Sequence, residues 1–375
     1  MSDSVATKAP GDGKTPPQRG AHSLSEILSQ PRCWEACLAE IEKNHSIAEI
    51  TKTFAHAPEW LFIGCGSSYY VALAAAATMK ALTGRSARAV PASEILLYPE
   101  LVFSNEFCVA VLISRSGQTS EVLKAAQVLR ERDISSIAVT CVKGQELERL
   151  AGTTIVLPAD EKSTVMTRSF TSMLLALQYL AGRIAASQAF CESLAAMPAM
   201  CQKRISPMQE QVREFVERHQ FADYVALAQG PLYGLSCEYA LKVTEMSVSY
   251  AQFFHSLEFR HGPKSIVSPE TLIIFLLSEQ GYEAEVDLLR EVKSLGGTTM
   301  VITDKAEEPV RASSDLLIEL PLDLPELARV APFLVPGQLL GLYTGLKKGL
   351  DPDSPRNLSR AVVLGDQPES KHAAL

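Results

Sequence analysis

The sequence of 375 residues lacks several features that would place it in a common class of protein. No apolar run approaches the ~20 residues that a membrane span needs; the longest, such as 271–277 and the alanine-rich 71–78, are far shorter. There is no Lys/Arg-rich run, and the formal net charge is −8, which argues against nucleic acid as the main partner. We therefore predict a soluble protein with neither a membrane nor a nucleic-acid partner.

The sequence also lacks the patterns of a secreted or zinc-binding protein. Its eight cysteines are scattered and form no C-x-x-C pair, so we interpret them as buried thiols in a reducing cytosol. Residues 1–22 are rich in Pro, Gly, Ser, Thr and charge and lack the apolar segment of a signal peptide, so they are predicted to form a disordered tail. We expect a cytoplasmic protein.

What is present is an alternation of apolar strands and amphipathic helices. Apolar residues at helical spacing, interrupted by Pro31, predict a helical lead-in from residue 23. After it we expect strands at 60–63, 87–90, 107–113, 136–140 and 154–157, a tight turn at 64–68, and helices at 69–83, 120–132 and 146–150. This alternation is typical of a parallel α/β sheet with helices on both faces.

The second half of the chain repeats this order. The expected elements are strands at 224–228, 272–277 and 299–302, a turn at 230–234, and helices at 235–248 and 283–295. Two similar halves in a chain of this length indicate two domains that arose by internal duplication. The predicted division is 23–205 for the lead-in and first domain, 206–350 for the second domain, and 351–375 for a C-terminal tail.

The most informative stretch is Ser114-Arg115-Ser116-Gly117-Gln118-Thr119, between a predicted buried strand and a predicted helix. Hydroxyls, backbone N–H groups and a helix N-terminus would converge there, beyond the carboxyl ends of the strands, which suits a phosphate. The loop has no Lys and no G-x-x-x-x-G-K-[ST] pattern, so a sugar phosphate fits better than a nucleoside triphosphate. An ordinary helix cap is the alternative. The matching stretch 278–282 carries Glu279, so we expect one phosphate site per chain.

A series of motifs, in order, resembles the double sugar-isomerase (SIS) proteins. The resemblance runs from about residue 26 to 364 and rests on the stretches 64–68, 114–119, 166–171, 238–245 and 259–265. It implies two tandem SIS domains, each a parallel sheet flanked by helices in a flavodoxin-like three-layer αβα sandwich. Within the family, the sequence resembles the isomerase half of glucosamine-6-phosphate synthase and the stand-alone amino-sugar-6-phosphate deaminase/isomerases.

The resemblance also implies roles for particular residues. Glu245 matches the base that moves a proton between C1 and C2, and Lys242 lies on the same helical face. His261 matches the histidine that opens the sugar ring and acts in the neighbouring subunit of a homodimer. The substrate-binding residues would be Ser67, Ser68, Ser114, Arg115 (Gln in the synthase), Ser116, Thr119, Thr164, Glu258 and Arg360. No metal and no organic cofactor are implied.

The residue types alone leave simpler readings open. Lys242 and Glu245 are three positions apart on a predicted helix, so they can tune each other's ionisation or form a plain surface ion pair. His261 precedes Gly262-Pro263 and lies on a predicted loop, where it can exchange protons near neutral pH or simply be hydrogen-bonded.

Two departures from the synthase favour the opposite reaction. No N-terminal glutaminase domain with a nucleophilic cysteine is expected ahead of residue 23, and Arg360 stands near the lysine position that forms an imine in the synthase. An arginine stays protonated and cannot form that imine. We therefore expect conversion of glucosamine 6-phosphate to fructose 6-phosphate and ammonia. The alternatives are a galactosamine-6-phosphate deaminase yielding tagatose 6-phosphate, a fructosamine-6-phosphate deglycase, and a non-catalytic sugar-phosphate sensor.

Overall fold

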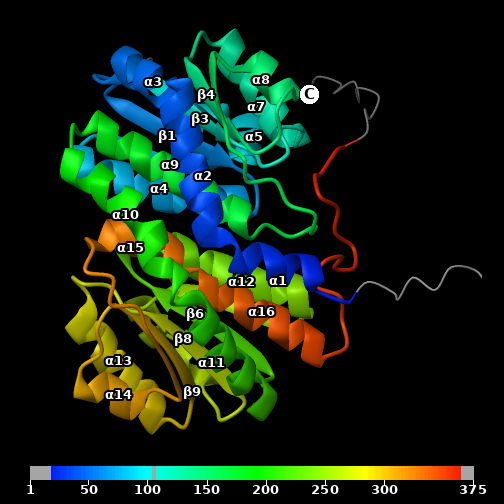
Figure 1. The fold of residues 1–375 in the computed structure, drawn as a ribbon, viewed down its shortest axis with the longest axis vertical. Helices are drawn as coiled ribbons and strands as arrows, with labels where there is room; N and C mark the ends of the chain where they lie inside the picture. The colour runs from blue at the N-terminus through cyan, green and yellow to red at the C-terminus, as the bar shows by residue number, and fades with distance from the viewer. Residues whose placement is uncertain (1–17, 104–106, 365–375) are drawn as a thin grey trace, which may run out of the picture.

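The computed structural model describes residues 18–103 and 107–364. Figure 1 shows two α/β units, one formed by the first half of the chain and one by the second, with helices between them. The first sheet consists of β1 (Glu59–Gly64), β2 (Ser86–Pro91), β3 (Cys108–Ile113), β4 (Ser136–Thr140) and β5 (Thr153–Val156). The second consists of β6 (Asp223–Ala228), β7 (Tyr250–His255), β8 (Thr271–Leu276), β9 (Thr298–Thr303) and β10 (Leu316–Glu319).

The two sheets have the same topology. The strand order is β2-β1-β3-β4-β5 in one and β7-β6-β8-β9-β10 in the other, and all neighbouring strands are parallel. This is the flavodoxin-like order, in which ligands bind beyond the carboxyl ends of the strands. The predicted fold class and the internal duplication are confirmed.

Helices cover both faces of each sheet. Those of the first half are α1 (Ala21–Leu28), α2 (Gln30–Asn44), α3 (Ser46–Phe54), α4 (Ser67–Thr83), α5 (Ala92–Leu97), α6 (Pro99–Val102), α7 (Ser120–Glu131), α8 (Glu146–Leu150), α9 (Arg168–Ile184) and α10 (Gln188–Gln202). Those of the second half are α11 (Ile205–Arg218), α12 (Tyr233–Ser247), α13 (Tyr282–Ser294), α14 (Glu308–Ser313), α15 (Glu326–Phe333) and α16 (Val335–Lys347). Three short 3-10 turns complete the second half: η1 (Gly230–Leu232), η2 (Leu257–Arg260) and η3 (Pro263–Ile266).

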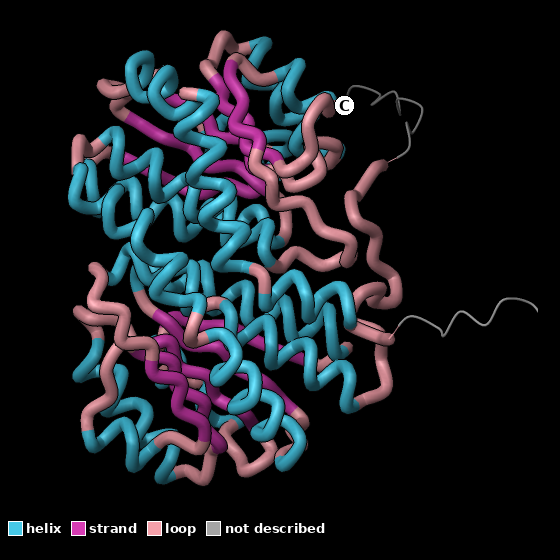
Figure 2. The backbone as a smooth tube through the Cα atoms, viewed as in Figure 1, coloured by secondary structure: helices cyan, strands magenta, loops and turns pink. Residues whose placement is uncertain are grey.

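One hydrophobic core runs through both units. Because side chains alternate along a strand, Trp60 and Phe62 of β1 face this shared core, whereas Leu61 and Ile63 face a separate cluster under α5 and α7. The outer face of the second sheet packs in the same way against α13. Figure 2 shows the result, two sheets separated by layers of helices.

Helix α12 is enclosed at the centre of the molecule. A Cβ at Gly341 of α16 would lie 2.7 Å from the carbonyl oxygen of Lys242, and a Cβ at Gly234 of α12 would lie 2.7 Å from the carbonyl oxygen of Tyr70 in α4. Only glycine permits these close approaches. As a result the side chains of Lys242 and Glu238 on α12 are fully buried.

Both ends of the described chain are attached to the folded units. Residues 1–17 of the predicted tail lie outside the described residues, but α1 already begins at Ala21, so the predicted tail boundary at residue 22 is too late. The Gly20 N–H donates to Asp351 Oδ1 at 3.0 Å and the Ser23 N–H to Asp353 Oδ1 at 2.7 Å, which orders this start. Of the predicted C-terminal tail, 365–375 lie outside the described residues and 351–364 run beside the first unit (Figure 1).

In the described part of the chain, no helix combines the length and apolar character that crossing a membrane requires. All eight cysteines fall in the described part and are free thiols, seven of them buried and Cys65 half-buried.

Candidate functional site

A cavity of about 210 Å³ lies beyond the carboxyl ends of β1 and β3. Its walls come from parts of the chain that are far apart in sequence: the start of α4, the loop after β3, the segment before α9, one residue of α12, and the C-terminal segment 358–362. Eight of the residues predicted to contact the substrate or act on it line this cavity: Ser67, Ser68, Arg115, Ser116, Thr119, Thr164, Glu245 and Arg360.

The loop after β3 is a tight turn held by its own hydroxyls. Ser114 Oγ accepts a hydrogen bond from the Gly117 N–H at 3.2 Å and lies 3.1 Å from Thr119 Oγ1. Gly117 has a φ of +65°, and a Cβ there would approach Gln145 to 2.8 Å, so glycine is needed. Thr119 is the N-cap residue of α7 but makes no side-chain capping bond. Its hydroxyl contacts Ser114 Oγ and the residue lines the cavity, which argues against a simple helix cap.

Ser67 and Ser68 are the first residues of α4, not part of the turn predicted at 64–68. Gly66, with φ +54° and ψ −127°, redirects the chain from β1 into the helix, a conformation that residues with a Cβ rarely adopt. The helix therefore starts two residues earlier than its apolar pattern indicates. Its N-terminal end faces the cavity, where the helix dipole favours an anion.

Arg115 is directed into the protein and holds three segments together. Its guanidinium pairs with Glu161 at 3.1 Å and donates to the carbonyl oxygens of Thr164 at 2.8 Å, Val165 at 3.2 Å and Arg360 at 2.8 Å. The side chain is 5% exposed. Arg115 thus borders the cavity while its terminal nitrogens are used by protein partners.

The C-terminal segment forms one wall of the cavity. Besides the contact of its backbone with Arg115, the Val362 carbonyl oxygen accepts from the Ser120 N–H at 3.1 Å. The guanidinium of Arg360 pairs with Asp160. Arg360 therefore lines the cavity with its carbonyl oxygen bound by Arg115 and its charge partly balanced by a neighbouring carboxylate.

A buried ammonium holds the carboxylate that faces the cavity. Lys242 Nζ contacts Glu245 Oε2, lies 3.2 Å from Glu238 Oε1, and donates to Ser67 Oγ at 3.4 Å. Burial acts to lower the pKa of Lys242, but the two neighbouring carboxylates outweigh it and leave that pKa above its usual value. Lys242 therefore stays charged, and Glu245, whose side chain is 18% exposed, presents its carboxylate to the cavity.

Glu238 is a site residue to which the sequence analysis assigned no role. Burial raises its pKa to about 8, although the Lys242 ammonium opposes this shift. Glu238 Oε1 accepts from Ser67 Oγ at 3.0 Å, and among the described residues Oε2 has no hydrogen-bond partner and is free to carry a proton. The signal in the sequence is the spacing Glu238, Lys242, Glu245, which places all three on one face of a helix.

The remaining predicted residues lie elsewhere. Ser114 is buried behind the loop, and neither it nor His261 nor Glu258 is among the described residues that line this cavity. His261 and Glu258 are exposed and belong to the η2–η3 region, which is anchored to α13 because Arg260 and Lys264 both pair with Glu291, at 2.9 and 2.6 Å. Within one chain the structure does not bring His261 to Glu245.

The described residues show no obvious set of metal-binding side chains. Within ranges 18–103 and 107–364, no group of three or more His, Cys, Asp or Glu side chains is arranged to hold a metal ion.

The described residues form a duplicated α/β protein in which a cavity lined by Ser and Thr residues is also lined by Glu245, the partner of the buried Lys242. Comparison with known proteins gives the family. The SIS domain model matches residues 53–183 and 225–335, and the chain belongs to this family, with two SIS repeats. Its relatives include glutamine–fructose-6-phosphate aminotransferases (isomerizing), a glucosamine-6-phosphate deaminase and a tagatose-6-phosphate ketose/aldose isomerase.

Three relatives illustrate the range. A glutamine–fructose-6-phosphate aminotransferase (isomerizing) from Pyrobaculum aerophilum is 28% identical over 352 residues, covering 91% of this chain but only 57% of the relative. A glucosamine-6-phosphate deaminase structure from Thermotoga maritima is 30% identical, with a TM-score of 0.74 over 92% of this chain and 100% of that one. The tagatose-6-phosphate ketose/aldose isomerase of Escherichia coli, at 22% identity and TM-score 0.80 over 93% and 97% of the two chains, shares the fold.

Proposed function

We propose that this protein is an amino-sugar-6-phosphate deaminase/isomerase that converts glucosamine 6-phosphate and water to fructose 6-phosphate and ammonia. The observation that carries the proposal is the Glu245 carboxylate, which faces the same cavity as the hydroxyls of Ser116 and Thr119. A base and a phosphate-binding loop in one sugar-sized space are what a phosphosugar isomerase requires. The similarity to the Thermotoga maritima deaminase structure over nearly the whole chain supports the choice of reaction.

In this proposal the phosphate lies between the starts of α4 and α7. The hydroxyls of Ser68, Ser116 and Thr119 and the positive ends of the two helices surround it, and Ser67, whose hydroxyl donates to Glu238, borders it at the start of α4. Arg115 acts indirectly, because its terminal nitrogens already bind Glu161 and backbone carbonyl groups. It positions the loop, Thr164 and the C-terminal wall.

Glu245 would carry out the proton transfer. In the open-chain amino-aldose it removes the proton from C2, and the resulting enol-type intermediate is reprotonated at C1 to give a ketose imine. Water adds to the imine carbon, and ammonia leaves from the carbinolamine to give the ketose. Lys242 holds the carboxylate in place. The described residues that line the cavity include no lysine, which supports a deaminase over an enzyme that forms an imine with its substrate.

Ring opening would depend on a second subunit. His261 is exposed and does not line the cavity of its own chain, so we propose that it reaches the cavity of the partner in a homodimer. Mixing Glu245→Gln chains with His261→Asn chains tests this directly, since a hybrid dimer contains one intact site. Recovery of activity is expected, and none would be recovered if His261 had no role in a partner's site.

The reaction is tested by product analysis. Purified protein incubated with glucosamine 6-phosphate should release ammonia and fructose 6-phosphate in equal amounts. Absence of both products at high enzyme concentration would overturn the proposal. Galactosamine 6-phosphate in the same assay distinguishes the epimer, and release of an amino acid from fructosamine-6-phosphate adducts would identify a deglycase. A protein that binds these compounds and turns over none of them would be a sensor.

A further inference from the structure

The second unit repeats the phosphate-type loop but fills it with a carboxylate. Ser278 Oγ accepts from the Gly281 N–H at 3.1 Å, as Ser114 does from Gly117 in the first unit. Here, however, Glu285 of α13 is fully buried and accepts from the Ser278 N–H and hydroxyl, both at 2.8 Å, and from the Ser256 hydroxyl at 2.6 Å. The donors that could hold a phosphate are already used, and a negative charge stands in its place.

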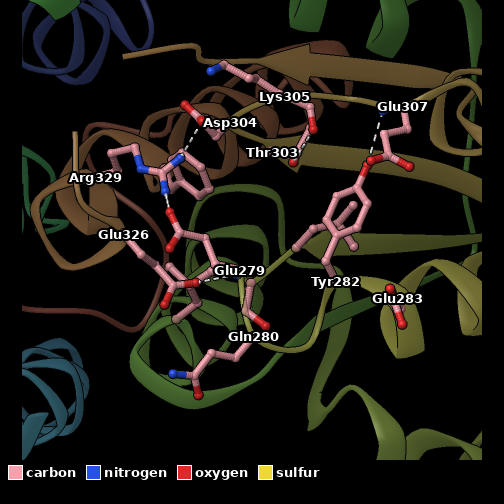
Figure 3. A pocket seen from close by; sticks show the side chains of 14 residues that line it. Glu279, Gln280, Tyr282, Glu283, Thr303, Asp304, Lys305, Glu307, Glu326 and Arg329 are labelled. Atoms are coloured by element: carbon pink, nitrogen blue, oxygen red, sulfur yellow. Dashed lines mark hydrogen bonds and ion pairs between the residues drawn. The ribbon is translucent and has the colours of Figure 1, made fainter. Parts of the chain in front are cut away.

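A cavity of about 510 Å³ nevertheless lies beside this loop, beyond the carboxyl ends of β8 and β9 (Figure 3). Leu232, Leu277 and Phe333 supply apolar wall, and Tyr282 supplies a ring. Among the described residues, five acidic and two basic side chains line it, which leaves three negative charges uncompensated: Glu279, Glu283, Asp304, Glu307 and Glu326 against Lys305 and Arg329. A phosphorylated ligand would be repelled, whereas a cation would be attracted.

Several side chains in the wall of this cavity are held in place by contacts with one another. Arg329, whose side chain is 4% exposed, pairs with Asp304 at 2.9 Å and with Glu279. Its Nε–H has no hydrogen-bond partner among the described residues. Glu326 accepts from the Glu279 N–H at 2.6 Å, so its carboxylate is held in a fixed position. The cavity wall therefore combines carboxylates that are held in place with one buried donor, the Arg329 Nε–H, that has no acceptor among the described residues.

We propose that this cavity binds a polyhydroxylated primary amine of hexose size, such as an unphosphorylated amino sugar. Its ammonium group is attracted by the uncompensated carboxylates, among them Glu283 and Glu326 on opposite sides of the cavity, and its ring packs on the apolar wall. The cavity lies at the same edge of its sheet as the first one but is larger, and the phosphate-binding element is lost. The choice of an amino sugar rests on the proposed function, because the proposed substrate, glucosamine 6-phosphate, carries the same amine. The preference for a hydroxylated cation rests on the lining of this cavity alone.

Calorimetric titration of the full chain with glucosamine tests the proposal, with glucose as the neutral compound of the same shape. We expect glucosamine to bind at least about tenfold more tightly than glucose, and the double variant Glu283→Gln/Glu326→Gln to lose about tenfold in glucosamine affinity. Asp287→Asn removes one charge from the same helix outside the cavity and should bind as the unaltered chain does. Thermal unfolding checks that each variant is folded.

Equal affinity for glucose and glucosamine, or unchanged affinity in the double variant, would overturn the proposal, as would absence of glucosamine binding at millimolar concentration. Thr119→Val, which alters the first cavity, separates the two sites. If it abolished glucosamine binding, the amine would occupy the catalytic cavity and the proposal would be wrong. Deamination of glucosamine 6-phosphate is measured separately. If the proposed function is wrong, the calorimetric result for glucosamine binding can still be interpreted.

Discussion

The two α/β units have one topology but contribute different chemistry. Counted from the first residues of β1 and β6, Ser68 corresponds to Leu232, and the three residues Glu238, Lys242 and Glu245 correspond to Ala74, Thr78 and Ala81 of α4. The first unit supplies the hydroxyl loop, and the second supplies the ionisable groups on α12. Neither unit contains a complete site.

The comparison shows how a duplicated fold avoids two competing sites. Small residues on α4 allow α12 to pack against it, so the charges come from one helix only. The loop charges are also reversed: Arg115 pairs with Glu161 in the first unit, and the corresponding Glu279 pairs with Arg329 in the second. This reversal is consistent with the ligands proposed above, an anionic one for the first cavity and a cationic one for the second.

The largest effect is expected from Glu245→Gln, which removes the proposed base, a residue of the second unit that faces the cavity of the first. Turnover should fall about a thousandfold, the usual contribution of general acid–base catalysis, while sugar-phosphate binding persists because the loop is intact. Steady-state kinetics and calorimetric binding check both parts. Asp287→Asn, an exposed carboxylate on α13, is the matched control and should keep full activity. Full activity of Glu245→Gln would remove α12 from the mechanism.

A second prediction compares the two loop ion pairs. Arg115→Met leaves the buried Glu161 uncompensated and should lower the free energy of unfolding by about 3 kcal/mol. It should also detach the C-terminal wall, detected as faster proteolysis within 351–364 and a higher KM. Glu279→Gln should cost about 1 kcal/mol or less, because the Glu279 side chain is 58% exposed and Arg329 keeps Asp304.

Arg115→Lys distinguishes positioning from charge alone. A lysine keeps the charge but lacks the planar fork that reaches four acceptors, so it should restore stability partly and KM little. Equal losses in Arg115→Met and Glu279→Gln, or complete rescue by lysine, would contradict the positioning role.

The sequence predicts the fold well where the chain is simplest. Buried parallel strands such as 107–113 are continuous apolar runs, so their presence and their alternation with helices are legible. Strand β7 was missed because it is an edge strand with no fully buried residue and hence no apolar run. The start of α4 was placed too late, since Ser67 and Ser68 are turn-like residues whose helical role depends on the conformation of Gly66.

The site could be predicted only in part. Its residue types could be predicted, because hydroxyls after a strand and a Lys–Glu pair on a helix are local patterns. The pairing of Arg115 with Glu161 could not be predicted, since it joins loops 46 positions apart and depends on the tertiary fold. The raised pKa of Glu238 follows from complete burial, which no local pattern reveals.

A third prediction compares the hydroxyls of the two loops. Ser116→Ala and Thr119→Val should each raise KM for the sugar phosphate about tenfold, the value of one hydrogen bond to a charged group, with little change in stability. Ser278→Ala in the second unit should leave KM unchanged and lower the free energy of unfolding by about 1 kcal/mol, because its hydroxyl serves Glu285 and Gly281. A raised KM in Ser278→Ala would indicate a second phosphate site.

The last prediction concerns Glu238, which lies on α12 where α4 has Ala74, and its effect appears only as a change of stability with pH. Because burial raises the pKa of Glu238 from its usual 4.5 to about 8, the folded chain binds this proton more tightly than the unfolded chain. That contribution to stability is complete below pH 4.5 and is lost as the pH rises through about 8, with a slope of at most about 1.4 kcal/mol per pH unit. Glu238→Gln keeps an acceptor for Ser67 but cannot titrate, so its urea-unfolding midpoint should depend less on pH between 5.5 and 8.5. Glu214→Gln, at an exposed ion pair on α11, is the matched control and should follow the unaltered chain. Parallel profiles for the Glu238 variant and the unaltered chain would show that Glu238 is already ionised when buried, with Lys242 neutralising both carboxylates of α12.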